Sequence, residues 1–226
     1  AAELARALAE LEPDNSAGSD DAQAETQALA MLSAAYDPVH GGFGPAPKFP
    51  PVEQIRLLLR RHRREGDEQA AAMARTTLTE IARGGICEQL GGGFHRYSVD
   101  DRWLAPHFEK MLYDNALLAG AYLEGCQAFG DGLLADVAVR TLEYALRELR
   151  SPEGVFYSAQ DAGEVGAEGA YYVWRRDELR ELLSSADLAA LGGVYDLSPN
   201  FEEAIILAVR PGADLQARKA PTVHVA

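Results

Sequence analysis

The chain has 226 residues, 47% of them hydrophobic, and a formal net charge of −14 at pH 7. A chain of this length can build one sizeable core, or one core with a small appendage. The negative charge argues against nucleic acid and anionic membrane surfaces as partners, since both would repel it. No apolar run approaches a bilayer span, and the start of the chain shows no signal-peptide pattern, so neither is expected.

The cysteine content points to a reducing compartment. Cys87 and Cys126 are the two cysteines of the chain, and they form no CxxC pair and no cluster with metal-ligand spacing. We therefore expect two reduced thiols in a cytoplasmic protein, with no metal site and no cofactor.

In chain order, residues 1–11 are predicted as a short Ala/Leu-rich helix and residues 12–21 as a polar linker with Pro and Gly. Residues 22–226 are predicted as one domain. Apolar residues three and four positions apart dominate it and predict a series of helices. One helix is expected to end near Asp37, a second to start after Pro50–Pro51, and a third to cover residues 70–81. A fourth is expected to start after Pro106, a fifth to end before Ser151, and a short sixth to contain Leu179–Leu183.

Two short β-prone runs, Val155–Tyr157 and Ala170–Trp174, flank a loop rich in Gly, Asp and Glu. This arrangement predicts a β-hairpin.

A glycine-aromatic corner recurs along the chain. Gly42, Gly93 and Gly154 each precede an aromatic residue closely, they are 51 and 61 residues apart, and each interval holds two predicted helices. A helix pair of this kind cannot bury its own apolar faces, whereas pairs stacked around an axis can. The pattern predicts an all-α fold of radial helix hairpins, with the corners gathered at one rim.

The densest polar and aromatic stretch runs from Gly91 to Asn115 and contains His95, Arg96 and Tyr97. Pro106 predicts a helix start that places His107 and Glu109 in the first turn, with His107, Lys110 and Asp114 on one face and Tyr113 beside them. Carboxylates, imidazoles and aromatic rings are the groups that a sugar site needs. The alternative is an ordinary Lys110–Asp114 helix pair and a histidine that satisfies a loop carbonyl.

Three further features have both a functional and a structural interpretation. Asp161 and Glu168, closed by Trp174, could form a carboxylate pair or a cation site, or a solvated acidic hairpin tip. Lys48 lies on a proline-stiffened loop that is either part of the rim or a rigid surface turn. Trp103 and Tyr97 could stack on a sugar ring, or belong to the core.

The segments 41–50, 84–115 and 156–174 closely resemble motifs of the spermatogenesis-associated thioredoxin-domain proteins and their bacterial relatives, and Asn200–Glu202 resembles a fourth. The resemblance covers about residues 22–207. It implies a partial (α/α)6 toroid of three to four helix hairpins with small β-hairpin insertions at one rim, similar to N-acylglucosamine 2-epimerases and six-hairpin glycosidases. It also implies a thioredoxin-like domain and further helix pairs beyond this stretch of sequence.

The chain departs from the family pattern at a few positions. Gly163 stands where a second acidic residue is usual, Glu164 where a serine is usual, and Cys87–Glu88 where Tyr-Asp is usual. If the paired acids were catalytic or bound a cation, this chain has lost that function.

The sequence therefore predicts a carbohydrate-active domain, similar to a sugar isomerase or epimerase or to a glycoside hydrolase. The alternative is a non-catalytic scaffold or ligand-binding domain, working as a homodimer or with a missing second half of the toroid. The predicted catalytic residues are His95, Arg96, His107, Glu109, Asp114 and Asp161. The predicted substrate-binding residues are Lys48, Tyr97, Trp103, Tyr113, Asn115, Glu168 and Trp174.

Overall fold

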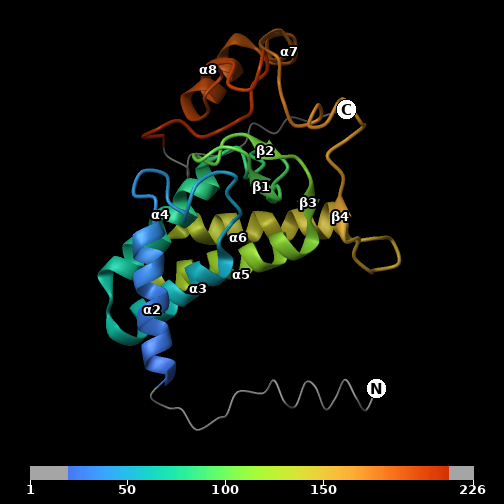
Figure 1. The fold of residues 1–226 in the computed structure, drawn as a ribbon. Coiled ribbons are helices and arrows are strands. Elements are labelled where there is room, and N and C mark those ends of the chain that lie inside the picture. The colour runs from blue at the N-terminus through green and yellow to red at the C-terminus, as the bar shows by residue number, and fades with distance from the viewer. Residues whose placement is uncertain (1–19, 214–226) are drawn as a thin grey trace. The chain divides into compact units, whose positions relative to one another are not determined.

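The computed structural model describes residues 20–213. The helix predicted at 1–11, and most of the linker predicted at 12–21, lie outside the described residues. The chain divides into two compact units between Ala35 and Tyr36. Within the described residues the first unit is helix α2 (Asp20–Ala35), which confirms a helix ending near Asp37 (Figure 1). The domain boundary predicted after residue 21 stays a prediction.

The second unit is mainly helical. Its helices are α3 (Val52–Glu65), α4 (Glu68–Arg83), α5 (Leu112–Phe129), α6 (Gly132–Tyr144), α7 (Arg176–Leu182) and α8 (Ser185–Val194), with a π-helical turn at Ala145–Leu149 that extends α6.

Two of the helix pairs share the same turn chemistry. Gly66 ends α3 and Gly130 ends α5, both in the left-handed conformation that glycine adopts without strain. The next residue is an aspartate in each case: Asp67 accepts a hydrogen bond from Ala70 N, and Asp131 accepts one from Leu133 N. A Gly-Asp dipeptide thus ends one helix and caps the next, which gives short connections between antiparallel helices.

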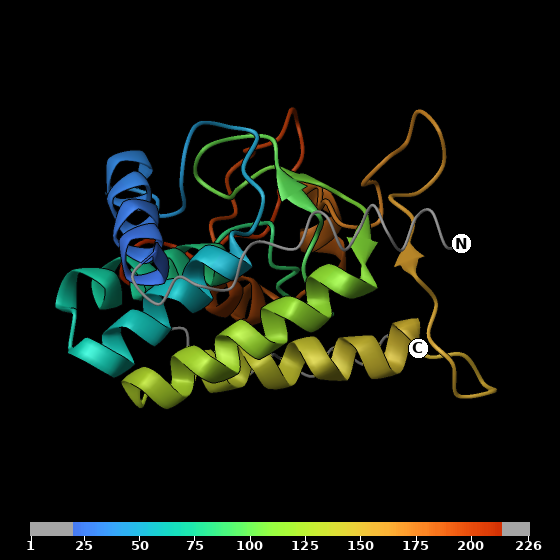
Figure 2. The same cartoon turned by 60° about the horizontal axis from the view of Figure 1, so that its bottom comes forward.

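Helices α3 to α6 bury the larger core. Figure 2 shows α5 and α6 side by side, and α5 also packs on α3 and α4. Leu78, Leu118 and Leu134 are fully buried between these helices, and the Tyr122 hydroxyl donates to Leu78 O at 2.8 Å. A second, smaller core lies between α7, α8 and the segment 205–209.

The glycine-aromatic corners share one backbone feature, an isolated antiparallel bridge that closes each loop. The bridged pairs are Tyr36 with Phe43, Cys87 with Phe94, and Arg150 with Phe156. Two short antiparallel pairs complete the strands: β1 (Tyr97–Ser98) with β2 (Pro106–His107), and β3 (Lys110–Met111) with β4 (Ala159–Gln160). The predicted fold class, a partial α/α toroid with small strand insertions, is confirmed.

The predicted helix start after Pro106 is wrong. Residues 106–111 are extended, because Pro106–His107 pairs with Tyr97–Ser98 and Lys110–Met111 pairs with Ala159–Gln160. The helix begins only at Leu112. His107 and Glu109 are therefore not in a helical first turn, and His107, Lys110 and Asp114 do not share a helix face.

The predicted hairpin between Val155 and Trp174 is also wrong. The two runs do not pair with each other: Phe156 in the first run bridges to Arg150, and Trp174 in the second bridges to Ile205. Ala159–Gln160, which follow the first run, pair with Lys110–Met111. Helix α8 was not predicted. No helix in residues 20–213 has the length and apolar character needed to cross a membrane.

Candidate functional site

Strand geometry sorts the polar residues of the 95–110 region into two groups. Successive side chains of an extended segment point to opposite faces, and from 107 to 110 the side chains alternate between partly exposed and buried. His107 and Glu109 face the partly exposed side, whereas Phe108 and Lys110 face the interior. We call the first group, Arg96, His107, Glu109, Tyr113 and Asp114, the open cluster. We call the second, Glu88, His95, Lys110, Tyr144 and Tyr172, the buried cluster.

The open cluster joins the end of β2 to the first turn of α5. Glu109 Oε2 lies 3.4 Å from Arg96 Nη1 and 3.7 Å from His107 Nδ1. The Tyr113 phenol lies beside the guanidinium and is the chief cause of the raised pKa of Arg96, to which Glu109 adds. The side chains of Arg96, His107 and Glu109 are 31–40% exposed, so the group is accessible to a ligand.

Asp114 is the most perturbed carboxyl of the open cluster. Burial raises its pKa from 3.8 to about 6, although the charge of Arg96 acts in the opposite direction. Such a carboxyl can hold and release a proton near neutral pH, as a general acid or base must. Perturbed groups of this kind often mark functional sites.

Three polar atoms of the open cluster are left without a hydrogen bond. Asp114 Oδ2, His107 Nδ1 and Arg96 Nε are buried, and none has a hydrogen-bond partner within the part of the chain that the structure describes. Buried polar atoms in folded proteins are usually paired. The open cluster therefore holds hydrogen-bonding capacity that the described residues leave unsatisfied.

An aromatic ladder borders the open cluster. The Tyr97 ring stacks on the His107 ring, with their centroids 4.9 Å apart. The Phe49 ring also packs against Tyr97, with 4.8 Å between their centroids. Phe49 is 55% exposed. The open cluster thus has polar groups beside an exposed apolar ring, the combination that binds a sugar face and its hydroxyls.

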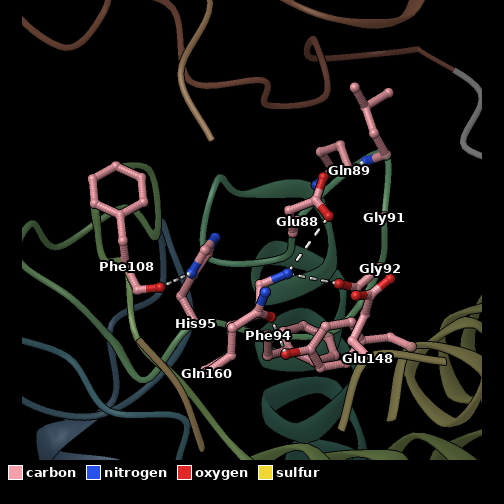
Figure 3. Close-up of polar contacts among 12 residues, drawn as sticks. Glu88, Gln89, Gly91, Gly92, Phe94, His95, Phe108, Glu148 and Gln160 are labelled. Atoms are coloured by element: carbon pink, nitrogen blue, oxygen red, sulfur yellow. Dashed lines mark hydrogen bonds and ion pairs between the residues drawn. The ribbon is translucent and has the colours of Figure 1, made fainter. Parts of the chain in front are cut away.

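The buried cluster is centred on Lys110, and Figure 3 labels Glu88 and Gly92, two of the residues that its ammonium contacts. Its Nζ donates to Gly92 O at 2.9 Å and lies 3.5 Å from Glu88 Oε2. The rings of Tyr144 and Tyr172 lie 4.4 and 4.9 Å from the same nitrogen. Burial lowers the pKa of Lys110, and Glu88 partly offsets this. Because a carbonyl, a carboxylate and two rings already satisfy the ammonium, Lys110 holds the glycine corner in place.

His95 belongs to the buried cluster and not to the open one. Its Nδ1 donates to Phe108 O at 2.9 Å, and burial followed by the charge of Lys110 lowers its pKa well below 6.5. The ring is therefore neutral at pH 7. His95 lines a cavity of about 20 Å³, which is room for a single water and not for a sugar.

Three of the predicted substrate-binding residues are buried and hold the loops together. Lys48 Nζ donates to Asp37 Oδ2 at 2.6 Å and to Gly41 O at 3.0 Å. Trp103 is fully buried and donates from Nε1 to His40 O at 2.8 Å. Asn115 accepts from Phe94 N at 2.7 Å and donates to Phe94 O and Met111 O. None of the three is among the partly exposed residues of the open cluster.

The predicted acidic pair also lies apart from the open cluster. Asp161 and Glu168 are exposed on the loop that follows β4, and Trp174 is half-buried beside Ile205. Of the predicted residues, the structure brings together Arg96, Tyr97, His107, Glu109, Tyr113 and Asp114. Within residues 20–213 no group of three or more His, Cys, Asp and Glu side chains could hold a metal ion.

Sequence reasoning missed two residues. Glu88 appeared only as a departure from the family pattern, and the structure makes it the ion-pair partner of Lys110. Phe49 was not singled out, although it follows Lys48 on the proline-rich loop, where a large apolar side chain next to a buried lysine points to the surface. In an extended segment, neighbouring side chains point to opposite faces, so a buried Lys48 would have predicted an exposed Phe49.

Comparison with known proteins agrees with the motifs. The chain is 44% identical over 179 residues to spermatogenesis-associated protein 20 of Homo sapiens, which covers 75% of this chain and 23% of that protein. The corresponding protein of Mus musculus is 44% identical over 168 residues, or 70% of this chain and 21% of the relative. The chain thus spans about a quarter of the length of the curated relatives it matches. No protein-family model matches it.

Solved structures share the fold at low sequence identity. Cellobiose 2-epimerase from Bacillus thermoamylovorans aligns with a TM-score of 0.53 and 14% identity, over 62% of this chain and 40% of the epimerase. Cellobiose 2-epimerase from Spirochaeta thermophila gives 0.53 and 19%, over 65% and 41%. At these identities the similarity establishes the fold alone.

Proposed function

The chain belongs to the spermatogenesis-associated protein 20 family, and from this premise we propose that the open cluster is the catalytic site of a carbohydrate-active domain. The proposed reaction is proton transfer at a sugar carbon, as in isomerases and epimerases. The observation that carries it is Asp114, a carboxyl close to the charge of Arg96 with a pKa of about 6, whose Oδ2 has no hydrogen-bond partner among the described residues.

The roles follow from the chemistry of each group. A base removes the proton from the carbon next to the sugar carbonyl, and the electron pair moves onto the carbonyl oxygen to give an enediolate. Arg96, a permanent cation with free N–H donors, stabilises that oxygen. Asp114 and His107 take the roles of base and acid, and a proton returned to the other face or to the neighbouring carbon completes epimerisation or isomerisation.

The fold supports this proposal without carrying it. Solved neighbours of the chain act on sugars according to their names, but the same fold hosts many reactions, so the analogy is associational. Tyr97 and Phe49 add support, because an exposed aromatic ladder beside polar groups suits a sugar ring.

Hydrogen exchange with solvent tests the proposal directly. The chain is incubated in D₂O with a panel of aldoses, ketoses and disaccharides, and deuterium at the carbon next to the carbonyl is followed by NMR. We expect exchange with at least one sugar and a loss of about 100-fold in Asp114→Asn. Exchange that is unchanged in Asp114→Asn, or absent with every sugar, contradicts the proposal.

Glycoside hydrolysis is the alternative within the same class. It needs two carboxyls, Glu109 with Asp114 or Asp161, on either side of the scissile bond. New reducing ends without deuterium exchange would support it, and their loss in Asp161→Asn would bring that exposed carboxylate into the site. The position of Asp161 outside the open cluster favours the epimerase chemistry.

A partner-binding scaffold is the candidate from a different class, and one observation favours it. Leu123 on α5, Val139 and Leu142 on α6, and Leu146 after it are each about half exposed. Exposed apolar side chains on α5 and α6 favour association with another surface, a second copy of the chain or the rest of a toroid. We expect a dimer by light scattering, and a clean monomer would count against self-association.

A further inference from the structure

A cavity of about 510 Å³ opens at the C-terminal end of α4 and shares no residue with the open cluster. Its volume is in the range of small-molecule sites. Four segments of the second unit line it: the first glycine corner at His40, the last turn of α4, the 102–104 loop, and residues 196–212.

Three arginines are among the residues that line this cavity, Arg83, Arg102 and Arg210. The chain carries 21 basic and 35 acidic residues, so its overall charge is negative. A local excess of positively charged guanidinium groups is therefore opposite in sign to the charge of the whole chain. Two acids also line the cavity. The Asp196 carboxylate already accepts a hydrogen bond from Ser198 N, and burial raises the pKa of Glu80, although Arg83 and His40 lower it. The lining is therefore net positive.

The end of a helix normally repels an anion, because its last carbonyls carry the negative end of the dipole. Here those carbonyls are occupied. Gly84 N donates to Glu80 O, and Val209 N donates to Arg83 O at 2.8 Å. The Gln89 side-chain amide donates to Ala82 O and to Gly84 O. With these acceptors satisfied, the guanidinium groups dominate the electrostatics of the cavity.

Two of the arginines are held in place by the backbone. Arg83 Nη2 donates to Arg210 O at 2.5 Å, and Arg210 Nη1 donates to Gly192 O at 2.9 Å. A guanidinium has five N–H donors, so most donors of both side chains stay available to a ligand. Arg102 adds a third, exposed guanidinium from its loop. Fixed guanidinium forks match the oxygens of a phosphate.

We propose that this cavity binds a small phosphomonoester, with the phosphate held by Arg83, Arg102 and Arg210. The cavity is larger than a phosphate ion, and its lining also includes Thr79 and Glu80, whose side chains can bond hydroxyls. A polyol or sugar phosphate therefore fits better than inorganic phosphate. This site is independent of the reaction proposed for the open cluster.

Calorimetric titration of the full chain tests the proposal with two probes, glucose 6-phosphate and inorganic phosphate, at matched ionic strength. Glucose and chloride serve as blanks. We expect saturable binding of both phosphates, with glucose 6-phosphate the tighter, and about tenfold weaker binding in Arg102→Gln. Arg102 is exposed on its loop, so this variant should stay folded.

The matched control is Arg180→Gln, which removes an exposed arginine on α7 that does not line the cavity. Its affinity for glucose 6-phosphate should equal that of the unmodified chain. Binding that is absent, that is equally strong for chloride, or that falls equally in both variants overturns the site. Binding of inorganic phosphate alone overturns the assignment to an organic phosphomonoester.

Discussion

Two places in the second unit set a carboxyl against a basic side chain, and they do so in opposite ways. At the first glycine corner, Asp37 accepts hydrogen bonds from Lys48 Nζ and from the backbone N–H groups of Val39 and His40. In the open cluster, Asp114 faces Arg96 but keeps Oδ2 without a hydrogen bond within the described residues. The same charges are present in both, and only the first is fully paired.

The pKa values move apart for that reason. Burial alone would raise the pKa of Asp37, but the bonds from Lys48, His40 and Val39 outweigh it and lower the pKa to about 2. At Asp114 burial is not offset by hydrogen bonds, and the pKa rises to about 6. A fully paired carboxylate stabilises the corner that contains it. A buried carboxylate without hydrogen bonds destabilises the fold, and its raised pKa is a property that a binding site can use.

The largest stability effect is expected when the paired corner is broken. Lys48→Met removes the ammonium from a buried pair and leaves Asp37 with its charge uncompensated. We expect a loss of about 3 kcal/mol in the free energy of unfolding at pH 7, measured by urea denaturation. A loss below about 1 kcal/mol would mean that the pair contributes little to the corner.

The pH dependence of that loss sharpens the comparison. Because the folded pKa of Asp37 is lowered, its stabilisation is present above the unfolded value of 3.8 and is lost as the pH falls towards about 2. The difference between the unmodified chain and Lys48→Met should therefore shrink across this range.

A smaller effect of the opposite sign is expected at the unpaired carboxyl. Because the folded pKa of Asp114 is raised, its ionisation destabilises the fold as the pH rises from 3.8 through about 6. The full difference corresponds to about 3 kcal/mol, and screening of this partly exposed group reduces it to about 1 kcal/mol. Asp114→Asn should be more stable than the unmodified chain by that amount at pH 8, and equal to it at pH 3.

Urea denaturation at both pH values measures this gain. Glu168→Gln, at an exposed position on the loop after β4, is the control and is measured at the same two pH values. A destabilised Asp114→Asn at pH 8 would place Asp114 among the paired, structural carboxylates.

Periodicity and turn chemistry in the sequence were sufficient to predict most helices. The run from Ala70 to Ile81 and its stop at Gly84 are reproduced by α4, and Pro51 immediately precedes α3. Helix α8 was missed although Ser184 and Asp187 form a capping pattern, since Gly192 and Gly193 weaken the helical signal near its end.

Long-range pairing explains the other errors. Pro106 looks like a helix start, but strand partners at Tyr97–Ser98 and Ala159–Gln160 hold residues 106–111 extended. Once that segment is known to be extended, alternation separates His107 and Glu109 from Lys110, and His95 from Arg96. Local sequence could therefore indicate which stretch holds the site, but not which of its residues share a side.

The most direct test of the account is an NMR titration of the two aspartate carboxyls in the chain labelled with ¹³C at the aspartate side-chain carbon. Asp37→Asn and Asp114→Asn assign the two signals. We expect the Asp114 carboxyl to titrate near pH 6 and the Asp37 carboxyl near pH 2. An Asp114 signal that titrates close to 3.8 would contradict it, because that carboxyl would then not be the unpaired proton-transfer group of the open cluster.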